Sequence, residues 1–190
     1  MKALEDRILK DGQVLPGHIL KVNSFLNHQV DTALTLEMGQ EIARLFAGDG
    51  VTKVLTIEAS GLPFAFAAAA ALKVPMIFAK KAKTSNVNED VYSATVHSYT
   101  HNKDNQIIVS RQVLGAGERV LIVDDFLANG CALAGLMEIV AQAGSQTVGC
   151  ATAIEKGFQG GGDGLRAKGV RVESLAIIDK MTDDSLEFRR

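Results

Sequence analysis

The sequence predicts an α/β fold with a mainly parallel central sheet flanked by helices. Apolar runs that suit strands occur at 54–57, 74–78, 120–123, 147–154 and 170–178. Such runs are typical of strands that are buried on both faces of a parallel sheet. Segments with apolar residues at helical spacing separate most of these runs, as in repeated strand–helix–strand units. With 190 residues, 47% of them hydrophobic, the chain is expected to form one domain over residues 1–190.

Charge and cysteine content narrow the class of protein. The formal net charge is −2, which disfavours a nucleic-acid or membrane partner held by bulk positive charge. The two cysteines, Cys131 and Cys150, form neither a disulfide framework nor a metal-binding pattern. Reduced thiols and the lack of an apolar signal core at the N-terminus indicate a cytoplasmic protein without a membrane segment.

The first 35 residues are predicted to form part of a small hood beside the sheet, together with residues 155–190. A short amphipathic helix ends at Gly12, a turn follows at Pro16 and Gly17, and residues 19–22 favour a strand. The segment 15–31 is apolar but carries several amides. It suits a surface loop and, equally, a cover that recognises a planar ligand.

The next segment alternates helices and strands. A helical pattern from Leu34 to Phe46 ends at the glycines that follow, and the strand 54–57 runs into the turn Glu58-Ala59-Ser60-Gly61. The Ala-rich stretch 62–72 predicts a helix that packs closely on the sheet. The strand 74–78 leads to three lysines: Lys80, Lys81 and Lys83.

Residues 84–105 form a polar segment, and the stretches 91–96 and 107–113 contain enough β-branched residues to predict a two-stranded arm there. A polar arm of this length suits a flexible active-site lid. When this segment is considered without the rest of the chain, a solvated hairpin is a slightly better interpretation than a lid.

The most informative stretch is VLIVDDFLANGCA, residues 120–132. An uninterrupted apolar strand is followed by Asp124 and Asp125, then by a small-residue loop with Gly130, and a helical pattern begins near Leu133. A strand that ends in such a loop and a helix start presents backbone N–H groups to an anion. Carboxylates beside that anion site can accept hydrogen bonds from sugar hydroxyls, so the stretch predicts a sugar-phosphate pocket.

The C-terminal part repeats the pattern with the strand 147–154, the segment Glu155-Lys156-Gly157-Phe158, a Gly-rich turn at 160–162, a short helix near Leu165 and the strand 170–178. In open α/β sheets, ligands lie beyond the carboxyl ends of the strands. The EASG turn, the lysine cluster and the paired acids all follow strands, so they are expected to converge there.

Each of these features has a purely structural interpretation when taken alone. A tight turn is usually only a turn, a lysine cluster is usually a solvated face, and paired aspartates are often helix caps. The sequence has neither GxGxxG after its first strand nor GxxxxGK[ST], which disfavours dinucleotide-binding and P-loop proteins.

The stretch VLIVDDFLANG resembles the signature of the type I phosphoribosyltransferases, which use 5-phosphoribosyl 1-diphosphate (PRPP). Four further segments, KVNSFLNHQVD, EASG, KKAKTSN and IEKGFQGG, are similar to the xanthine-specific branch of that family in bacterial purine salvage, and the resemblance covers nearly the whole chain. One departure is Cys131 in the phosphate loop. It is interpreted as a small packing residue in preference to an oxidation site.

The resemblance implies a role for each matching residue. Asp124 and Asp125 face the ribose as catalytic acids. The 5′-phosphate loop consists of Ala128, Asn129, Gly130, Cys131 and Ala132. The pyrophosphate is bound by Glu58, Ala59, Ser60, Gly61 and Lys81. The base contacts Leu20, Asn27, Lys156 and Phe126.

The resemblance also implies a Mg²⁺ ion held mainly by substrate and water, without direct protein ligands, and a homodimer. The expected reaction transfers the phosphoribosyl group of PRPP to N9 of xanthine, giving xanthosine 5′-monophosphate and pyrophosphate. A related enzyme acting on guanine, hypoxanthine or adenine is one alternative. The other is a non-catalytic, PRPP-sensing regulator, which is disfavoured because residues 1–31 show no helix-turn-helix pattern.

Overall fold

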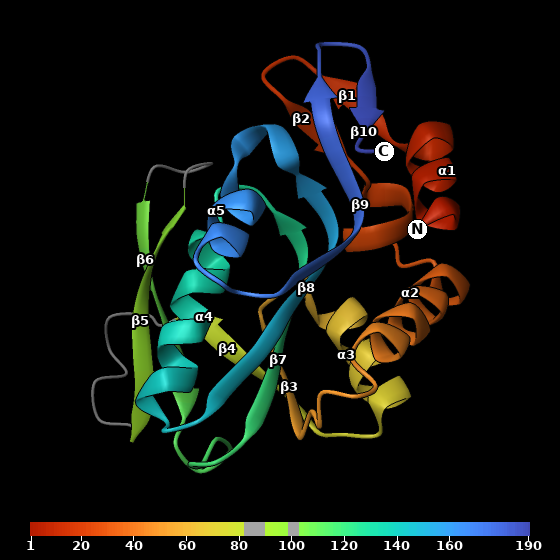
Figure 1. Ribbon diagram of the computed structural model, residues 1–190. Coiled ribbons are helices and arrows are strands. Elements are labelled where there is room, and N and C mark those ends of the chain that lie inside the picture. Colours follow the sequence, from red (N-terminus) through yellow and green to blue (C-terminus); the bar gives the residue numbers. More distant parts are fainter. Residues whose placement is uncertain (82–89, 99–102) are drawn as a thin grey trace.

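The computed structural model describes residues 1–81, 90–98 and 103–190, and it contains an eight-stranded sheet with helices on both faces (Figure 1). The strand order is β10-β9-β8-β7-β3-β4-β6-β5, and β1 and β2 form a separate hairpin. The elements in chain order are α1 (Lys2–Asp11), β1 (Gln13–Leu15), β2 (Ile19–Lys21), the π-helical turn η1 (Asn23–Asn27), α2 (Thr32–Leu45), β3 (Lys53–Ile57), α3 (Leu62–Leu72), β4 (Met76–Lys81), β5 (Val91–Ser98), β6 (Lys103–Ser110), β7 (Arg119–Leu127), α4 (Cys131–Gln142), β8 (Gln146–Lys156), the 3₁₀ turn η2 (Gly157–Gln159), α5 (Gly161–Ala167), β9 (Val172–Met181) and β10 (Leu186–Phe188).

The centre of the sheet is parallel, as the sequence predicts. Strands β4, β3, β7, β8 and β9 pair in parallel, whereas β6, β5 and β10 join the two edges in antiparallel fashion. Parallel neighbours bring their carboxyl ends to one edge of the sheet. The loops after β3, β7 and β8 therefore meet at that edge.

Two apolar cores lie on opposite faces of the sheet. Leu121 and Val123 of β7 pack with residues of α1, α2 and α3, whereas Val120 and Ile122 of the same strand pack with residues of α4 and of the β5–β6 hairpin. All four side chains have an exposed fraction of 0%. This two-sided burial explains why β7 is an uninterrupted apolar run rather than an alternating one.

Several predicted strand boundaries are wrong, and hydrogen bonds explain three of the shifts. Strand β4 begins at Met76 rather than Val74, because the Val74 N–H bonds back to the carbonyl of Ala69 at the end of α3. Strand β6 ends at Ser110, where a turn closes through the Val113 N–H. Strand β9 begins at Val172, since the Val170 N–H still bonds to Leu165 in α5.

Three shifts bear directly on the site. Strand β7 continues to Leu127, so Asp124 and Asp125 lie within it and do not follow its end. Lys80 and Lys81 belong to β4, while Lys83 lies outside the described residues. Helix α4 begins at Cys131, two residues before the predicted start near Leu133.

The hood contains elements that the sequence pattern did not reveal. Strand β1 pairs with β2, and β10 pairs with β9 at the edge of the main sheet. Both termini lie on this side of the molecule, close to α1 and the hood (Figure 1). Among the residues that the structure describes, no helix is both long enough and apolar enough to span a bilayer.

Candidate functional site

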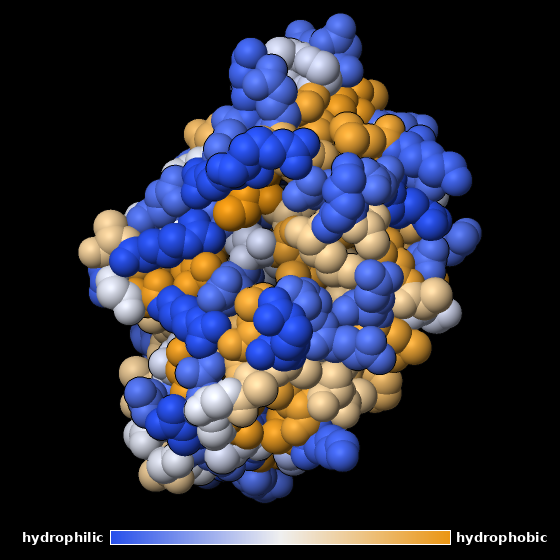
Figure 2. All heavy atoms as spheres, turned by 45° about the vertical axis from the view of Figure 1, so that its right-hand side comes forward, coloured by the Kyte–Doolittle hydropathy of each residue, from blue (hydrophilic) through white to orange (hydrophobic). Residues whose placement is uncertain are grey.

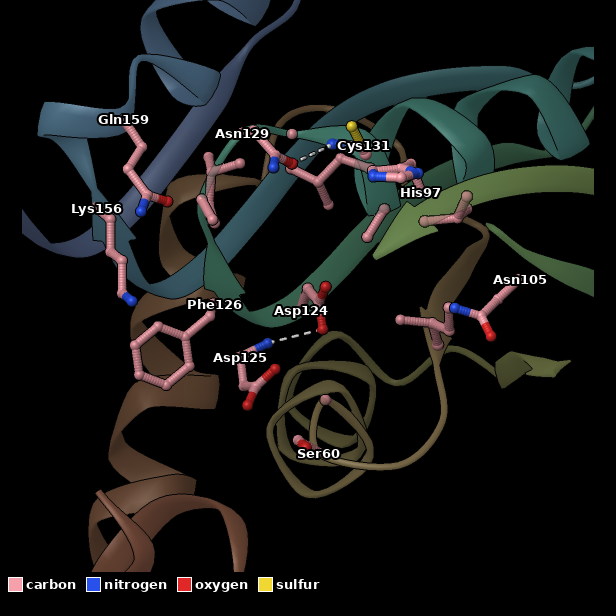
Figure 3. A pocket seen from close by; sticks show the side chains of 18 of the residues that line it. Ser60, His97, Asn105, Asp124, Asp125, Phe126, Asn129, Cys131, Lys156 and Gln159 are labelled. Carbon is pink, nitrogen blue, oxygen red and sulfur yellow. Dashed lines mark hydrogen bonds between the residues drawn. The ribbon is translucent and has the colours of Figure 1, made fainter. Parts of the chain in front are cut away.

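A cavity of about 860 Å³ opens at the carboxyl edge of the parallel strands. Its walls come from the hood, the β3–α3 turn, the end of β4, the β5–β6 hairpin, the β7–α4 loop and the end of β8 (Figure 3). The residues that line it are Gly17, His18, Ile19, Ile57, Glu58, Ser60, Gly61, Lys81, Val96, His97, Asn105, Ile107, Asp124, Asp125, Phe126, Leu127, Ala128, Asn129, Gly130, Cys131, Ala132, Leu133, Lys156 and Gln159.

Two buried carboxyls stand at the floor of this cavity. Asp124 is 6% exposed and Asp125 is 9% exposed, and an Asp124 carboxyl oxygen accepts the backbone N–H of Asp125 at 3.0 Å. Burial raises the pKa of Asp124 well above its ordinary value, and the neighbouring charge of Asp125 raises it further. Burial also raises the pKa of Asp125. A cationic or charge-neutralising ligand would favour the ionised form of both groups.

The loop from Ala128 to Gly130 connects β7 to α4 and is shaped to bind an anion. Gly130 adopts a left-handed conformation with φ +84°, which an L side chain rarely accepts. The Asn129 side-chain oxygen accepts the Cys131 N–H at 3.2 Å. The loop and the first turn of α4 line the cavity, so backbone amides and the positive end of the helix dipole are close to any bound ligand.

Helix α5 supports this loop from behind. The N–H of Gly161 donates to the carbonyl of Ala128 at 3.2 Å. A Cβ atom at Gly161 would lie 2.5 Å from the carbonyl carbon of Asn129 and would also collide with the Ala128 oxygen. The absence of a side chain at Gly161 therefore lets α5 contact the loop backbone directly.

The turn after β3 forms the opposite wall. The peptide bond between Glu58 and Ala59 is cis, and a Glu58 carboxylate oxygen accepts the backbone N–H of Lys81 at 2.7 Å. Ser60, Gly61 and Lys81 all line the cavity with Glu58, whereas Ala59 does not. The charge of Lys81 lowers the pKa of Asp124, against the larger effect of burial.

A lysine and an aromatic ring lie at the other end of the cavity. The Lys156 ammonium donates to the backbone carbonyl of His18 at 2.8 Å and stands 6.0 Å from the centroid of the Phe126 ring. Partial burial lowers the pKa of Lys156. The His18 ring packs against Phe158 with centroids 5.2 Å apart. This end offers a flat apolar surface beside a hydrogen-bond donor.

The structure separates two predicted base-binding residues from the cavity wall. Leu20 is 7% exposed and packs in the core, while its neighbour Ile19 lines the cavity. Side chains of a strand alternate between faces, so β2 can direct only one of the pair inward. The Asn27 amide donates toward Asp125, which lowers the pKa of that carboxyl, and its own oxygen is buried without a partner.

Several lining residues were missed in the sequence. His18, Ile19 and Gln159 come from the hood and η2, and His97 and Asn105 come from the β5–β6 hairpin. The hairpin thus forms a wall of the cavity where β5 ends and β6 begins. Residues 82–89 and 99–102, which belong to the predicted arm and its lysine, lie outside the described residues. The one local signal that could have indicated Ile19 is the strand predicted over residues 19–22, because side chains alternate between the two faces of a strand.

The arrangement suits a ligand with two chemically different halves. Backbone amides, Lys81 and the β3–α3 turn offer partners for phosphate groups, and the buried acids lie between them and the aromatic end. Phe126 and Lys156 suit a flat ring that carries hydrogen-bond acceptors. Figure 3 shows Asp124 and Asp125 between these two ends.

Comparison with known proteins gives a consistent result. Residues 30–181 match the model of the phosphoribosyl transferase domain family. A protein of Brevibacillus brevis named xanthine phosphoribosyltransferase is 55% identical over 188 residues, covering 99% of this chain and 96% of its own. Xanthine phosphoribosyltransferase 1 of Clostridium perfringens is 51% identical over 190 residues, covering 100% of both chains.

Solved structures show the same fold at lower identity. The APRTase of Giardia lamblia, solved with 9-deazaadenine, has a TM-score of 0.77 and 23% identity, covering 92% of this chain and 96% of its own. The adenine phosphoribosyltransferase of Saccharomyces cerevisiae has a TM-score of 0.72 and 20% identity, covering 92% and 99%. These likenesses concern the fold alone.

Proposed function

The chain belongs to the phosphoribosyl transferase domain family, and on that premise we propose that it transfers the 5-phosphoribosyl group of PRPP to N9 of xanthine. The products are xanthosine 5′-monophosphate and pyrophosphate. The observation that carries the proposal is the full-length identity of about half with relatives named xanthine phosphoribosyltransferase. The two-ended cavity supports it, because it has room and partners for both substrates.

In this reaction the C1′–pyrophosphate bond breaks and a bond from N9 to C1′ forms. Positive charge develops on the ribose ring in the transition state, as in other glycosyl transfers. Asp124 and Asp125 are proposed to lie against the ribose and to stabilise this charge in their ionised form. Their burial strengthens the interaction, since charges act more strongly where water is excluded.

The remaining contacts are proposed to bind and orient PRPP. The amides of Ala128, Asn129, Gly130, Cys131 and Ala132 would bind the 5′-phosphate. The turn Glu58, Ala59, Ser60 and Gly61, with Lys81, would bind the departing pyrophosphate. Holding both ends of PRPP orients C1′ toward the base and lowers the entropic part of the barrier.

A Mg²⁺ ion bound with PRPP fits these residues. Among the described residues, no group of three or more His, Cys, Asp or Glu side chains could hold a metal on its own. Carboxyls of Asp124, Asp125 and Glu58 nevertheless stand at the cavity wall, and Mg²⁺ commonly binds through one or two carboxylates, water and substrate phosphates. When bound, the ion would neutralise charge on the pyrophosphate as it leaves.

At the base end, Lys156 is proposed to donate to an exocyclic oxygen of xanthine and Phe126 to lie against its plane. One N–H of the Lys156 ammonium donates to the His18 carbonyl, and an ammonium has two further N–H groups that can donate to the base. Leu20 and Asn27 remain proposed base contacts through the hood. Their present positions, in the core and beside Asp125, would require a shift of η1 and β2 when the base binds.

The assembly is proposed to be a cytoplasmic homodimer, as the family resemblance implies. Two free cysteines are in keeping with a reducing compartment.

On the face turned forward in Figure 2, hydrophobic residues lie among hydrophilic ones. Two large hydrophobic side chains are exposed on the helices, Leu36 of α2 at 53% and Phe66 of α3 at 63%. Light scattering coupled to size-exclusion chromatography would test the dimer.

Steady-state kinetics with xanthine, guanine, hypoxanthine and adenine, each with PRPP and Mg²⁺, test the proposed function. We expect the highest kcat/KM for xanthine. A higher value for adenine would overturn the choice of base. PRPP binding without turnover of any of the four bases would instead point to a regulator. The Asp125→Asn variant serves as the control that the measured rate comes from this site.

A further inference from the structure

The base end of the cavity contains a second polar side chain, that of Gln159. It is exposed at the end of η2, directly after β8, and it lines the cavity. Figure 3 shows it on the same side of the cavity as Lys156 and Phe126. Within the described part of the chain, its amide has no hydrogen-bond partner. The amide is therefore available to a ligand at this end.

The turn that carries Gln159 is well supported. Gly160 adopts a left-handed conformation with φ +76°, and its N–H donates to the carbonyl of Gly157 at 2.9 Å. Gly157 is buried, and a Cβ atom there would lie 2.7 Å from a carboxylate oxygen of Asp179 and 3.1 Å from the guanidinium of Arg189. The backbone of η2 is thus packed in place, and a side chain on such a support can select a ligand at small entropic cost.

Xanthine presents a specific pattern on the edge remote from N9. Its C6 oxygen accepts a hydrogen bond, N1–H donates one, and its C2 oxygen accepts another. The Lys156 ammonium can only donate hydrogen bonds, so it can pair with the C6 oxygen of xanthine. The neighbouring N1–H and C2 oxygen then require one acceptor and one donor side by side. A primary amide offers this pair, and Gln159 is the lining residue that carries an amide beside Lys156.

We propose that Gln159 determines the preference for xanthine by pairing its amide with the N1–H and the C2 oxygen of the base. Guanine has donors at both N1 and C2, so the amide nitrogen would face another donor. Hypoxanthine has only a C–H at C2 and leaves the amide nitrogen unpaired. This inference rests on the proposed function and adds the residue that reads the C2 substituent.

The test compares Gln159→Met and Gln159→Glu with the wild type in steady-state kinetics on xanthine, guanine and hypoxanthine. Gln159→Met removes two hydrogen bonds from xanthine but only the one to N1–H from hypoxanthine, so kcat/KM for xanthine should fall by about 10- to 100-fold, and the fall for hypoxanthine should be about three- to tenfold smaller. Gln159→Glu offers two acceptors, so the guanine-to-xanthine ratio of kcat/KM should rise by about 100-fold or more. KM for PRPP should change little in both variants.

Gln40→Glu provides the matched control, since it makes the same chemical change on the exposed side of α2, away from the cavity lining. Because Gln159 is exposed, the variants should keep the wild-type Tm. An unchanged xanthine-to-hypoxanthine ratio in Gln159→Met overturns the role of Gln159 if the wild type prefers xanthine. A wild type that prefers adenine overturns the proposed function itself, and the role of Gln159 with it.

Discussion

At the scale of single residues, the proposed chemistry depends on two carboxyls that the fold keeps out of water. Asp124 and Asp125 are buried in β7 directly after the apolar run from Val120 to Val123. A folded protein without ligand gains little from such a pair, since burial disfavours their charged forms. This cost is consistent with a catalytic role, because binding sites often contain groups that destabilise the unliganded fold.

Replacing Asp124 by Asn should therefore separate stability from activity. The carboxamide oxygen can still accept the Asp125 N–H, and the desolvated charge is removed. We expect unfolding of the unliganded variant to cost on the order of 1–3 kcal/mol more at pH 8, the usual size of an uncompensated desolvation penalty. We expect kcat to fall by about 100-fold or more. Thermal unfolding and turnover are the measurements, with exposed Asp183→Asn as control.

The same pair predicts how stability changes with pH. A carboxyl whose pKa is raised on folding holds its proton more tightly in the folded state than in the unfolded state. It therefore destabilises the fold above its raised pKa, and that penalty disappears as the pH falls toward the ordinary value of 3.8. The extra stability of Asp124→Asn over the wild type should accordingly shrink as the pH falls from 8 to 4.5. A difference that grows on acidification would contradict the burial of a charged Asp124.

Lys156 gives a prediction about substrate recognition. If its ammonium donates to the base, Lys156→Ala should raise KM for xanthine by about 10- to 100-fold, the effect of one lost charged donor. KM for PRPP should change by much less. Exposed Lys168→Ala is the matched control. Equal increases in both KM values would argue against a base contact.

At the scale of elements, the phosphate loop depends on contact with α5. Gly161→Ala would place a methyl group against the backbone of Ala128 and Asn129, and backbone cannot yield as a flexible side chain can. We expect KM for PRPP to rise by about tenfold or more and stability to fall by about 1–3 kcal/mol. In the same helix, a Cβ atom at Gly164 meets nothing within 4 Å. Gly164→Ala should therefore leave KM for PRPP unchanged and is the control.

At the scale of the whole molecule, the end of the chain completes the site. The Arg189 guanidinium bonds to both carboxylate oxygens of Asp163 in α5 at 2.9 Å and to Asp179 of β9 at 2.9 and 3.1 Å. These ion pairs enclose Gly157, the residue after Lys156. The last residues of the sequence thereby support the turn at the base end of the cavity.

Loss of this support should weaken binding of the base more than binding of PRPP. We expect Arg189→Ala to raise KM for xanthine about three- to tenfold with little change in KM for PRPP, an effect smaller than that of losing a direct contact. Arg189→Lys, which keeps the charge, should recover part of the loss. Arg190→Ala is the neighbouring control. The Arg190 side chain is 76% exposed, and its guanidinium nitrogen lies 3.4 Å from a carboxylate oxygen of Glu5 in α1 rather than beside Gly157. An equal rise in both KM values would indicate general loosening of the fold.

The sequence alone determined the parallel centre of the sheet and most of the strand-end residues that are proposed to bind PRPP. Those features depend on local pattern: an apolar run that both faces bury, and short motifs at strand ends that parallel pairing brings to one edge. The residues Asp124, Asp125, Ser60, Gly61 and Lys81 all reach the cavity as expected.

Only the tertiary structure decided which residues line the end of the cavity that is proposed to bind the base. The alternation of β2 puts Ile19 in the wall and Leu20 in the core, and Asn27 turns toward Asp125. Gln159 faces the same cavity from the other end of the chain. No local pattern relates these segments, because they meet through the packing of the hood against the sheet. The physical reason is that a strand and the loop after it are specified by consecutive residues. The end of the cavity proposed for the base is instead assembled by long-range contacts between separate elements.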